Sequence, residues 1–190
     1  MDIFSFFQYA KPIVTVLHVI SVVFGMGAAL LSDVLFGFYG KDKRLSKNEI
    51  TTLSILSTIV WWSLVVITIS GVGLFLSNVQ KYLHSVKFLT KMTILLVLVA
   101  NGYVLNRVIW PHVIRRDFLT NAKEKNIRRG AFVCGAISVL SWVSVCMLGV
   151  LDSVPFSYAI LMTFYGSVVV VAVCVALIVE NRSLESKRRS

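Results

Sequence analysis

The chain has 190 residues, of which 57% are apolar and 15% charged. A soluble domain averages about 45–50% apolar and about 25% charged residues, and the apolar residues here are gathered in long uncharged runs. This composition excludes a water-soluble globule and a disordered chain, and three cysteines are too few for a disulfide scaffold. It predicts a polytopic membrane protein.

Five apolar runs are long enough to cross a membrane, because a helix needs about 20 mostly apolar residues to span about 30 Å of hydrocarbon. Pro12 is expected in the first turn of the first helix, where its missing N–H costs nothing. The sequence therefore predicts a single transmembrane domain, an all-α bundle of five membrane-spanning helices over about residues 12–38, 52–76, 87–110, 130–151 and 155–180.

The distribution of Lys and Arg predicts the orientation of this bundle. The loop after the first helix holds four such residues, the loop after the third helix six and the tail four, against three on the opposite side. Because the richer side faces the cytoplasm, we expect the N-terminus outside and the C-terminus cytoplasmic in a bacterial inner (plasma) membrane. The net charge of +10 then indicates contact with anionic lipids of the bilayer and no nucleic-acid partner.

Four ionisable residues fall at membrane depth, where each needs a partner or a function. They are His18 and Asp33 in the first helix and Lys91 and Arg107 in the third. At 1.5 Å per residue, His18 and Lys91 lie about 10 Å below the outer surface, and Asp33 and Arg107 about 22–24 Å lower. Asp33 and Arg107 are thus predicted to form a structural ion pair. The alternatives are that Arg107 extends to the interface or that the two line a proton or substrate path.

His18 and Lys91 cannot form a salt bridge, because both are cations when protonated. In their neutral forms an imidazole and an amine are lone-pair donors, and haem iron accepts such nitrogen ligands in an apolar pocket. His18 and Lys91 are therefore candidate haem iron ligands. His84, two turns before Lys91 on the same predicted helix face, is the alternative second ligand.

Small residues follow His18 at helical spacing along one face of the first helix. In membranes such a face usually lets a neighbouring helix approach closely. The alternative is a flat slot for a macrocycle held by His18. The residues concerned are Ser21, Gly25, Ala29 and Ser32.

Two short segments carry a family resemblance that covers about residues 12–110. Residues 17–27, LHVISVVFGMG, and residues 88–92, FLTKM, resemble the first and third helices of the HemJ-type protoporphyrinogen oxidases and the related copper resistance protein D superfamily. The resemblance implies haem b bound by His18 and Lys91. Asp33 and Val34 stand where those oxidases carry Pro-Arg, so the chain departs from the family pattern at this position. Tetrapyrrole oxidation is therefore implied by the resemblance of the other residues only.

The sequence thus leaves two functions open. One is a b-type haem protein for redox or electron transfer near the outer face. The other is a cofactor-free small transporter, or a structural or assembly subunit of a membrane complex. The substrate, the electron donor and any homo-oligomer are not determined by these patterns.

Overall fold

The computed structural model describes residues 3–39, 45–114, 125–151 and 153–189. Within these ranges the chain is helical and contains no strand. The predicted all-α class is confirmed, and five helices are long and apolar enough to cross a membrane, as a multi-pass membrane protein requires. The elements are α1 (Ile3–Tyr39), α2 (Lys47–Ser77), α3 (Val79–Leu83), α4 (Val86–Val104), η2 (Leu105–Ile109), α5 (Trp110–Val113), α6 (Lys125–Val150) and α7 (Tyr158–Arg189).

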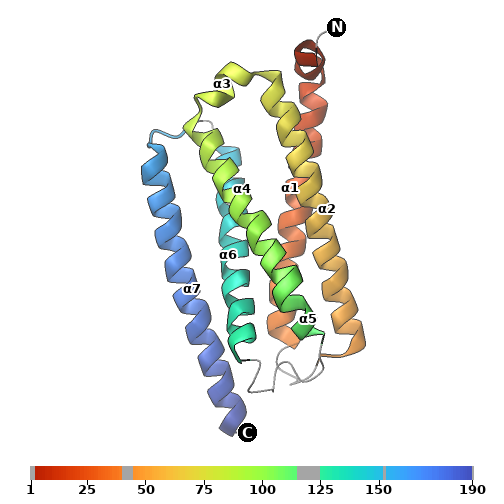
Figure 1. Cartoon of the computed structure of the whole chain (residues 1–190), viewed down its shortest axis with the longest axis vertical. Helices are drawn as coiled ribbons and strands as arrows, with labels where there is room; N and C mark the ends of the chain where they lie inside the picture. Colours follow the sequence, from red (N-terminus) through yellow and green to blue (C-terminus); the bar gives the residue numbers. More distant parts are fainter. Residues whose placement is uncertain (1–2, 40–44, 115–124, 152, 190) are drawn as a thin grey trace.

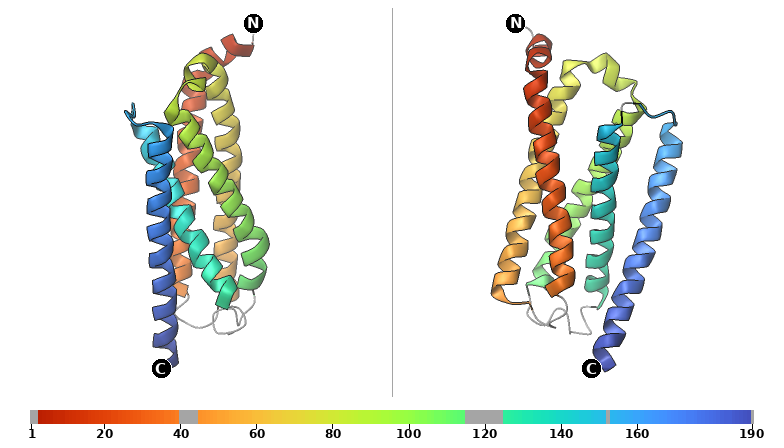
Figure 2. Two further views of the ribbon diagram at one scale, coloured as in Figure 1. Left: turned by 60° about the vertical axis from the view of Figure 1, so that its left-hand side comes forward. Right: turned by 180° about the vertical axis from the view of Figure 1, so that it is seen from behind.

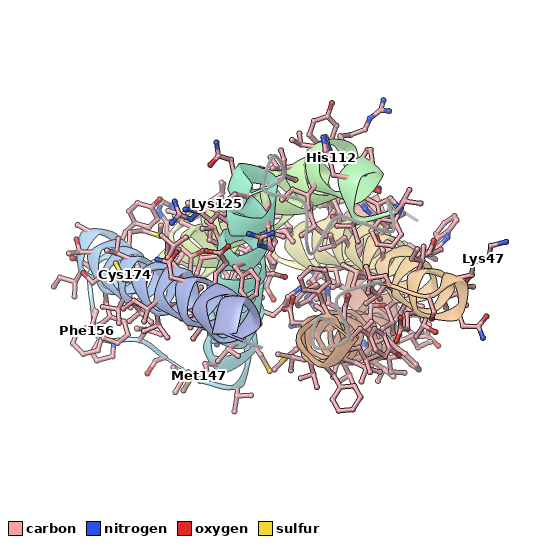
Figure 3. The ribbon with its side chains drawn as sticks, turned by 90° about the horizontal axis from the view of Figure 1, so that it is seen from below. Lys47, His112, Lys125, Met147, Phe156 and Cys174 are labelled. Carbon is pink, nitrogen blue, oxygen red and sulfur yellow. The ribbon has the colours of Figure 1, made fainter. Side chains whose placement is uncertain are left out.

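The spans form an elongated bundle in which α6 is the central element (Figure 1). The helices α1 and α2 pack together along their lengths, and α6 contacts α1, α4 and α7. Seen from the end that holds the C-terminus, α1 and α2 lie on one side and α7 on the other, with α4 and α6 between them (Figure 3). In the same view Lys47, at the start of α2, points away from the bundle. We call this the C-terminal end of the bundle, and the opposite end the N-terminal end.

Helix α1 begins at Ile3, so the expected start near Pro12 is wrong and the proline lies inside the helix. Pro12 cannot donate to the carbonyl of Gln8, and the turns before it lean away from the rest of α1 (Figure 2). The turns before Pro12 are held by a contact with α2. The ring of Phe7 packs against Gly73, only 3.1 Å from the position that a Cβ on this glycine would take. Packing against α2 therefore extends the helix beyond its apolar run.

Helix α2 begins five residues before the predicted run because of a capping box. The Ser46 hydroxyl accepts from the backbone N–H of Glu49, and the Glu49 carboxylate accepts from the backbone N–H of Ser46 at 2.6 Å. This reciprocal pair satisfies two donors that a helix start leaves without partners. The hydroxyl cap thus sets the start of α2 at Lys47.

The third span passes through a π-helical turn, η2, and continues as α5 beyond the predicted end. The backbone N–H of Trp110 donates to the carbonyl of Leu105, five residues earlier. Pro111 follows directly, and a proline clashes with the carbonyl four residues before it in a regular α-helix. The wider turn accommodates the proline without ending the span. Such turns are frequent at functional sites.

The central core lies where α1, α2, α4 and α6 meet. Its buried members are Ala29, Leu64, Ile67, Leu98 and Trp142. Helix α7 is attached by a smaller cluster around Ile94, Leu148 and Tyr165, and the Tyr165 and Ser141 hydroxyls lie 2.7 Å apart.

Candidate functional site

The carboxylate of Asp33 lies inside the bundle, six residues before the end of α1. Its Oδ2 is buried and has no hydrogen-bond partner among the described residues. A Cβ built on Gly135 of α6 would lie 3.0 Å from Oδ1, so the glycine lets α6 pass directly beside the acid. Because a buried polar atom without a partner costs free energy, Asp33 marks a site with a function or an occupant.

A cavity of about 70 Å³ surrounds this carboxylate. Its polar wall comes from four helices: Ser32 of α1, Ser57 of α2, Asn101 of α4 and Ser138 of α6. The cavity has room for a small number of water molecules. The remaining lining is Ala29, Val60, Trp61, Leu64, Leu98, Gly102, Leu105, Gly135 and Trp142.

Trp142 places a second atom without a partner in the same wall. The residue is 1% exposed, and within the described part of the chain its indole Nε1 finds no acceptor. Asn101 is held in place, because its Nδ2 donates to the backbone carbonyl of Cys134 at 2.9 Å. The cavity is thus lined by two residues that each bury one polar atom without a partner, one a donor and one an acceptor, and its lining is polar enough to hold water or a small cation.

A groove of about 250 Å³ adjoins this cavity on the outer side of α2. Ser57 and Trp61 line both hollows, so the groove and the cavity lie side by side at these two residues. Trp62 and Asn106 complete the groove toward the membrane, and both side chains are exposed. The other lining residues are Ser54, Thr58 and Val65.

The structure does not bring Asp33 and Arg107 together. Within the described part of the chain Asp33 forms no ion pair, whereas Arg128 and Arg129 pair with Glu180, and Arg107 is exposed on η2. The predicted pair rested on matched depths, and depth does not determine which way a helix face points. The π-helical turn also changes the angular spacing of side chains around Arg107. The alternative, in which Arg107 extends toward the interface, agrees with its exposure.

His18 is hydrogen bonded within the α1–α2 contact. Its Nδ1 lies 2.8 Å from the hydroxyl of Ser70, and that hydroxyl donates to the backbone carbonyl of Val66 at 2.6 Å. We infer that Nδ1–H donates to the serine oxygen. A Cβ built on Gly71 would lie 3.7 Å from the imidazole, so α2 approaches the ring closely.

Lys91 directs its amine toward α6 rather than toward α2. Its Nζ would lie 3.9 Å from a Cβ built on Gly149. The imidazole of His18 is thus hydrogen bonded to α2, whereas the amine of Lys91 lies beside α6. His84 is not on the face of Lys91 as predicted, because α4 begins at Val86 and His84 caps α3 instead.

The residues below His18 do not fit a macrocycle. A Cβ on Gly25 would lie 2.6 Å from Cη2 of Trp142 and 2.9 Å from Cβ of Ser63, so two other helices already fill that face. The close-approach interpretation of the small residues is confirmed, and the slot is not formed. Among the described residues no group of three or more His, Cys, Asp or Glu side chains could hold a metal ion. Haem ligation by His18 and Lys91 stays a prediction that nothing in this arrangement supports.

A buried ionic cluster at the C-terminal end of the bundle was missed by the sequence analysis. Glu180 of α7 is 1% exposed and accepts from Nε of Arg128 at 3.0 Å and from Nε of Arg129 at 3.4 Å. Arg129 also donates to the side chain of Asn181 at 2.9 Å. Counting both arginines as loop charges concealed this role. The available signal was an acid at the end of an otherwise uncharged span.

Comparison with protein-family models, curated proteins and solved structures finds no match to this chain. The functional argument therefore rests on the geometry of the site.

Proposed function

We propose that the protein is a small membrane transporter whose cation-binding site is the Asp33 carboxylate. The observation that carries the proposal is the buried Oδ2 atom, which lacks a partner among the described residues and belongs to a side chain that lines a polar cavity. Carboxylates at membrane depth mark ion pathways and proton relays. A single carboxylate neutralises one positive charge, so a proton or an alkali cation suits the site.

The other lining groups support the same chemistry. Ser32, Ser57, Ser138 and Asn101 line the same cavity as the acid. Oxygen atoms of this kind are the ligands of hard cations. With the Nδ2 atom of Asn101 engaged by the Cys134 carbonyl, the amide oxygen remains the group that can turn to the cavity. A cation bound here would replace its water shell with protein oxygen atoms.

The orientation of the bundle decides which side supplies the cation. The C-terminal end is proposed to face the cytoplasm, because the sequence assigns 14 Lys and Arg residues to that side against 3 to the other, and 12 remain when the paired Arg128 and Arg129 are left out. Asp33 is six residues, about 9 Å, from the end of α1 on this side. Cations would therefore bind from the cytoplasm of a bacterial-type inner membrane.

Ion flux into liposomes tests the proposal. Purified protein is reconstituted with a trapped pH-sensitive dye, and proton entry is measured under an imposed membrane potential; a parallel sample follows ²²Na⁺ uptake. We expect protein-dependent flux of one of the two ions, its loss in Asp33→Asn and its partial return in Asp33→Glu. Glu49→Gln is the control, because this carboxylate belongs to the helix cap of α2.

Equal flux in the original protein and in Asp33→Asn would contradict a role for Asp33. Absence of any protein-dependent flux, for protons and sodium alike, would favour a structural or assembly subunit.

A further inference from the structure

The groove outside the cation site has room and chemistry for an aromatic ring. Its volume is about 250 Å³, and a cavity of about 150 Å³ is enough to hold benzene. Trp61 and the 67% exposed Trp62 contribute indole rings to it. The groove opens on the lipid-facing side of α2 and η2, so a ligand could reach it from the membrane without crossing the water interface.

The charge next to the groove indicates the sign of such a ligand. Trp61 and Ser57 line both the groove and the cavity to which Asp33 contributes, so the two hollows are neighbours. The Asp33 carboxylate has no cationic partner among the described residues. Indole rings attract cations over their faces. Asn106, a neutral side chain, lines the groove on the η2 side, and Arg107 is not part of its lining.

We propose that the groove and the cavity together bind a lipophilic organic monocation, with its aromatic ring against Trp61 and Trp62 and its cationic group toward Asp33. This inference rests on the proposed function and names the substrate class of that same site. The ligand would enter sideways from the membrane and exchange with the proton or alkali cation at the carboxylate.

Isothermal titration of the purified full chain with benzyltrimethylammonium tests this assignment. This probe joins one aromatic ring to one fixed positive charge, and benzyl alcohol is the neutral control. We expect saturable binding of the cation at least tenfold tighter than that of benzyl alcohol. A quaternary ammonium donates no hydrogen bond, so this tenfold difference, about 1.4 kcal/mol, measures the attraction between opposite charges and the cation–π contact alone.

Variants separate the contributions of charge and ring. Asp33→Asn should weaken binding of benzyltrimethylammonium by about tenfold or more, Trp62→Ala should weaken it by about two- to tenfold, and Glu49→Gln should leave it unchanged. Arg107→Gln should strengthen it or leave it unchanged, because it removes a neighbouring positive charge. Thermal unfolding of each variant establishes that it is folded.

The outcomes distinguish this inference from the proposed function. Equal binding of the cation and benzyl alcohol would mean an apolar groove only and would overturn the assignment. Weaker binding of benzyltrimethylammonium in Arg107→Gln would also overturn it, because loss of a neighbouring positive charge cannot weaken a cation site of this kind. Asp33-dependent ion flux without benzyltrimethylammonium binding would remove the organic substrate and leave the transporter proposal standing.

Discussion

The indole of Trp142 occupies the space that a side chain at Gly25 would need. A Cβ at this glycine would lie 2.6 Å from Cη2 of the tryptophan and 2.9 Å from Cβ of Ser63, so three helices meet at one point. The tryptophan is 1% exposed and lines the cavity of Asp33. The glycine therefore positions one wall of the candidate site.

Gly25→Ala is expected to destabilise the bundle by about 1–3 kcal/mol, because the added methyl group must displace packed side chains or backbone. Gly27→Ala is the matched control, since a Cβ there meets nothing within 4 Å, and it should be neutral or slightly stabilising through helix propensity. Thermal or denaturant unfolding in detergent compares the two. Similar stability of both variants would contradict the close contact at Gly25.

Asp33→Asn is expected to leave the stability unchanged or to raise it. No ion pair of Asp33 is formed with Arg107, and the substitution removes a buried charge whose transfer from water is costly. The free energy of unfolding is measured for Asp33→Asn, Arg107→Gln and the double variant. A loss of about 1–3 kcal/mol that Arg107→Gln restores would establish the pair predicted from the sequence.

Glu180→Gln is expected to destabilise the bundle by about 1–3 kcal/mol, because it weakens two charge-assisted hydrogen bonds between α6 and α7. Arg129→Gln should cost less than about 1 kcal/mol, since this arginine side chain is 38% exposed and its contact is longer, at 3.4 Å. Unfolding of the two variants is compared under the same conditions. A larger effect at Arg129 than at Glu180 would mean that the carboxylate does not hold the cluster.

Protein purified from haem-replete cells is expected to show no Soret band. The Nδ1 hydrogen bond to Ser70 leaves Nε2 of His18 available, but Trp142 and Ser63 fill the helix face below it that a macrocycle would need. An absorption spectrum of the purified protein checks this expectation. A Soret band that is lost in both His18→Ala and Lys91→Ala would instead establish the haem site that the family resemblance implies.

A reporter fused after Ser190 tests the orientation. The excess of Lys and Arg on the side of the tail predicts that a reporter active only outside the cytoplasm is inactive there. The same reporter fused before the first residue should be active. Strong activity at the C-terminal fusion would reverse the assignment and would place the Asp33 cavity near the outer surface.

The sequence by itself determined the helical class and the number of spans. Each span must satisfy its own backbone hydrogen bonds and be apolar over the thickness of the hydrocarbon, and both properties can be read along one segment. The small residues at Ser21, Gly25 and Ala29 also correctly indicated a close helix contact, because a stripe on one helix face needs no knowledge of its partner.

Only the tertiary structure decided which side chains meet. Asp33 lies beside Gly135 rather than Arg107 because of the rotation of α1, α4 and α6 about their axes, which depth along a helix does not specify. The contact of Arg128 with Glu180 joins residues 52 positions apart, so no local pattern contains it. Asp33 could therefore be picked out as a candidate from the sequence, because burying a carboxylate in the membrane costs free energy. The cavity that it lines, the tryptophan side chains in that cavity and the absence of an ion pair for the carboxylate follow from how the helices pack.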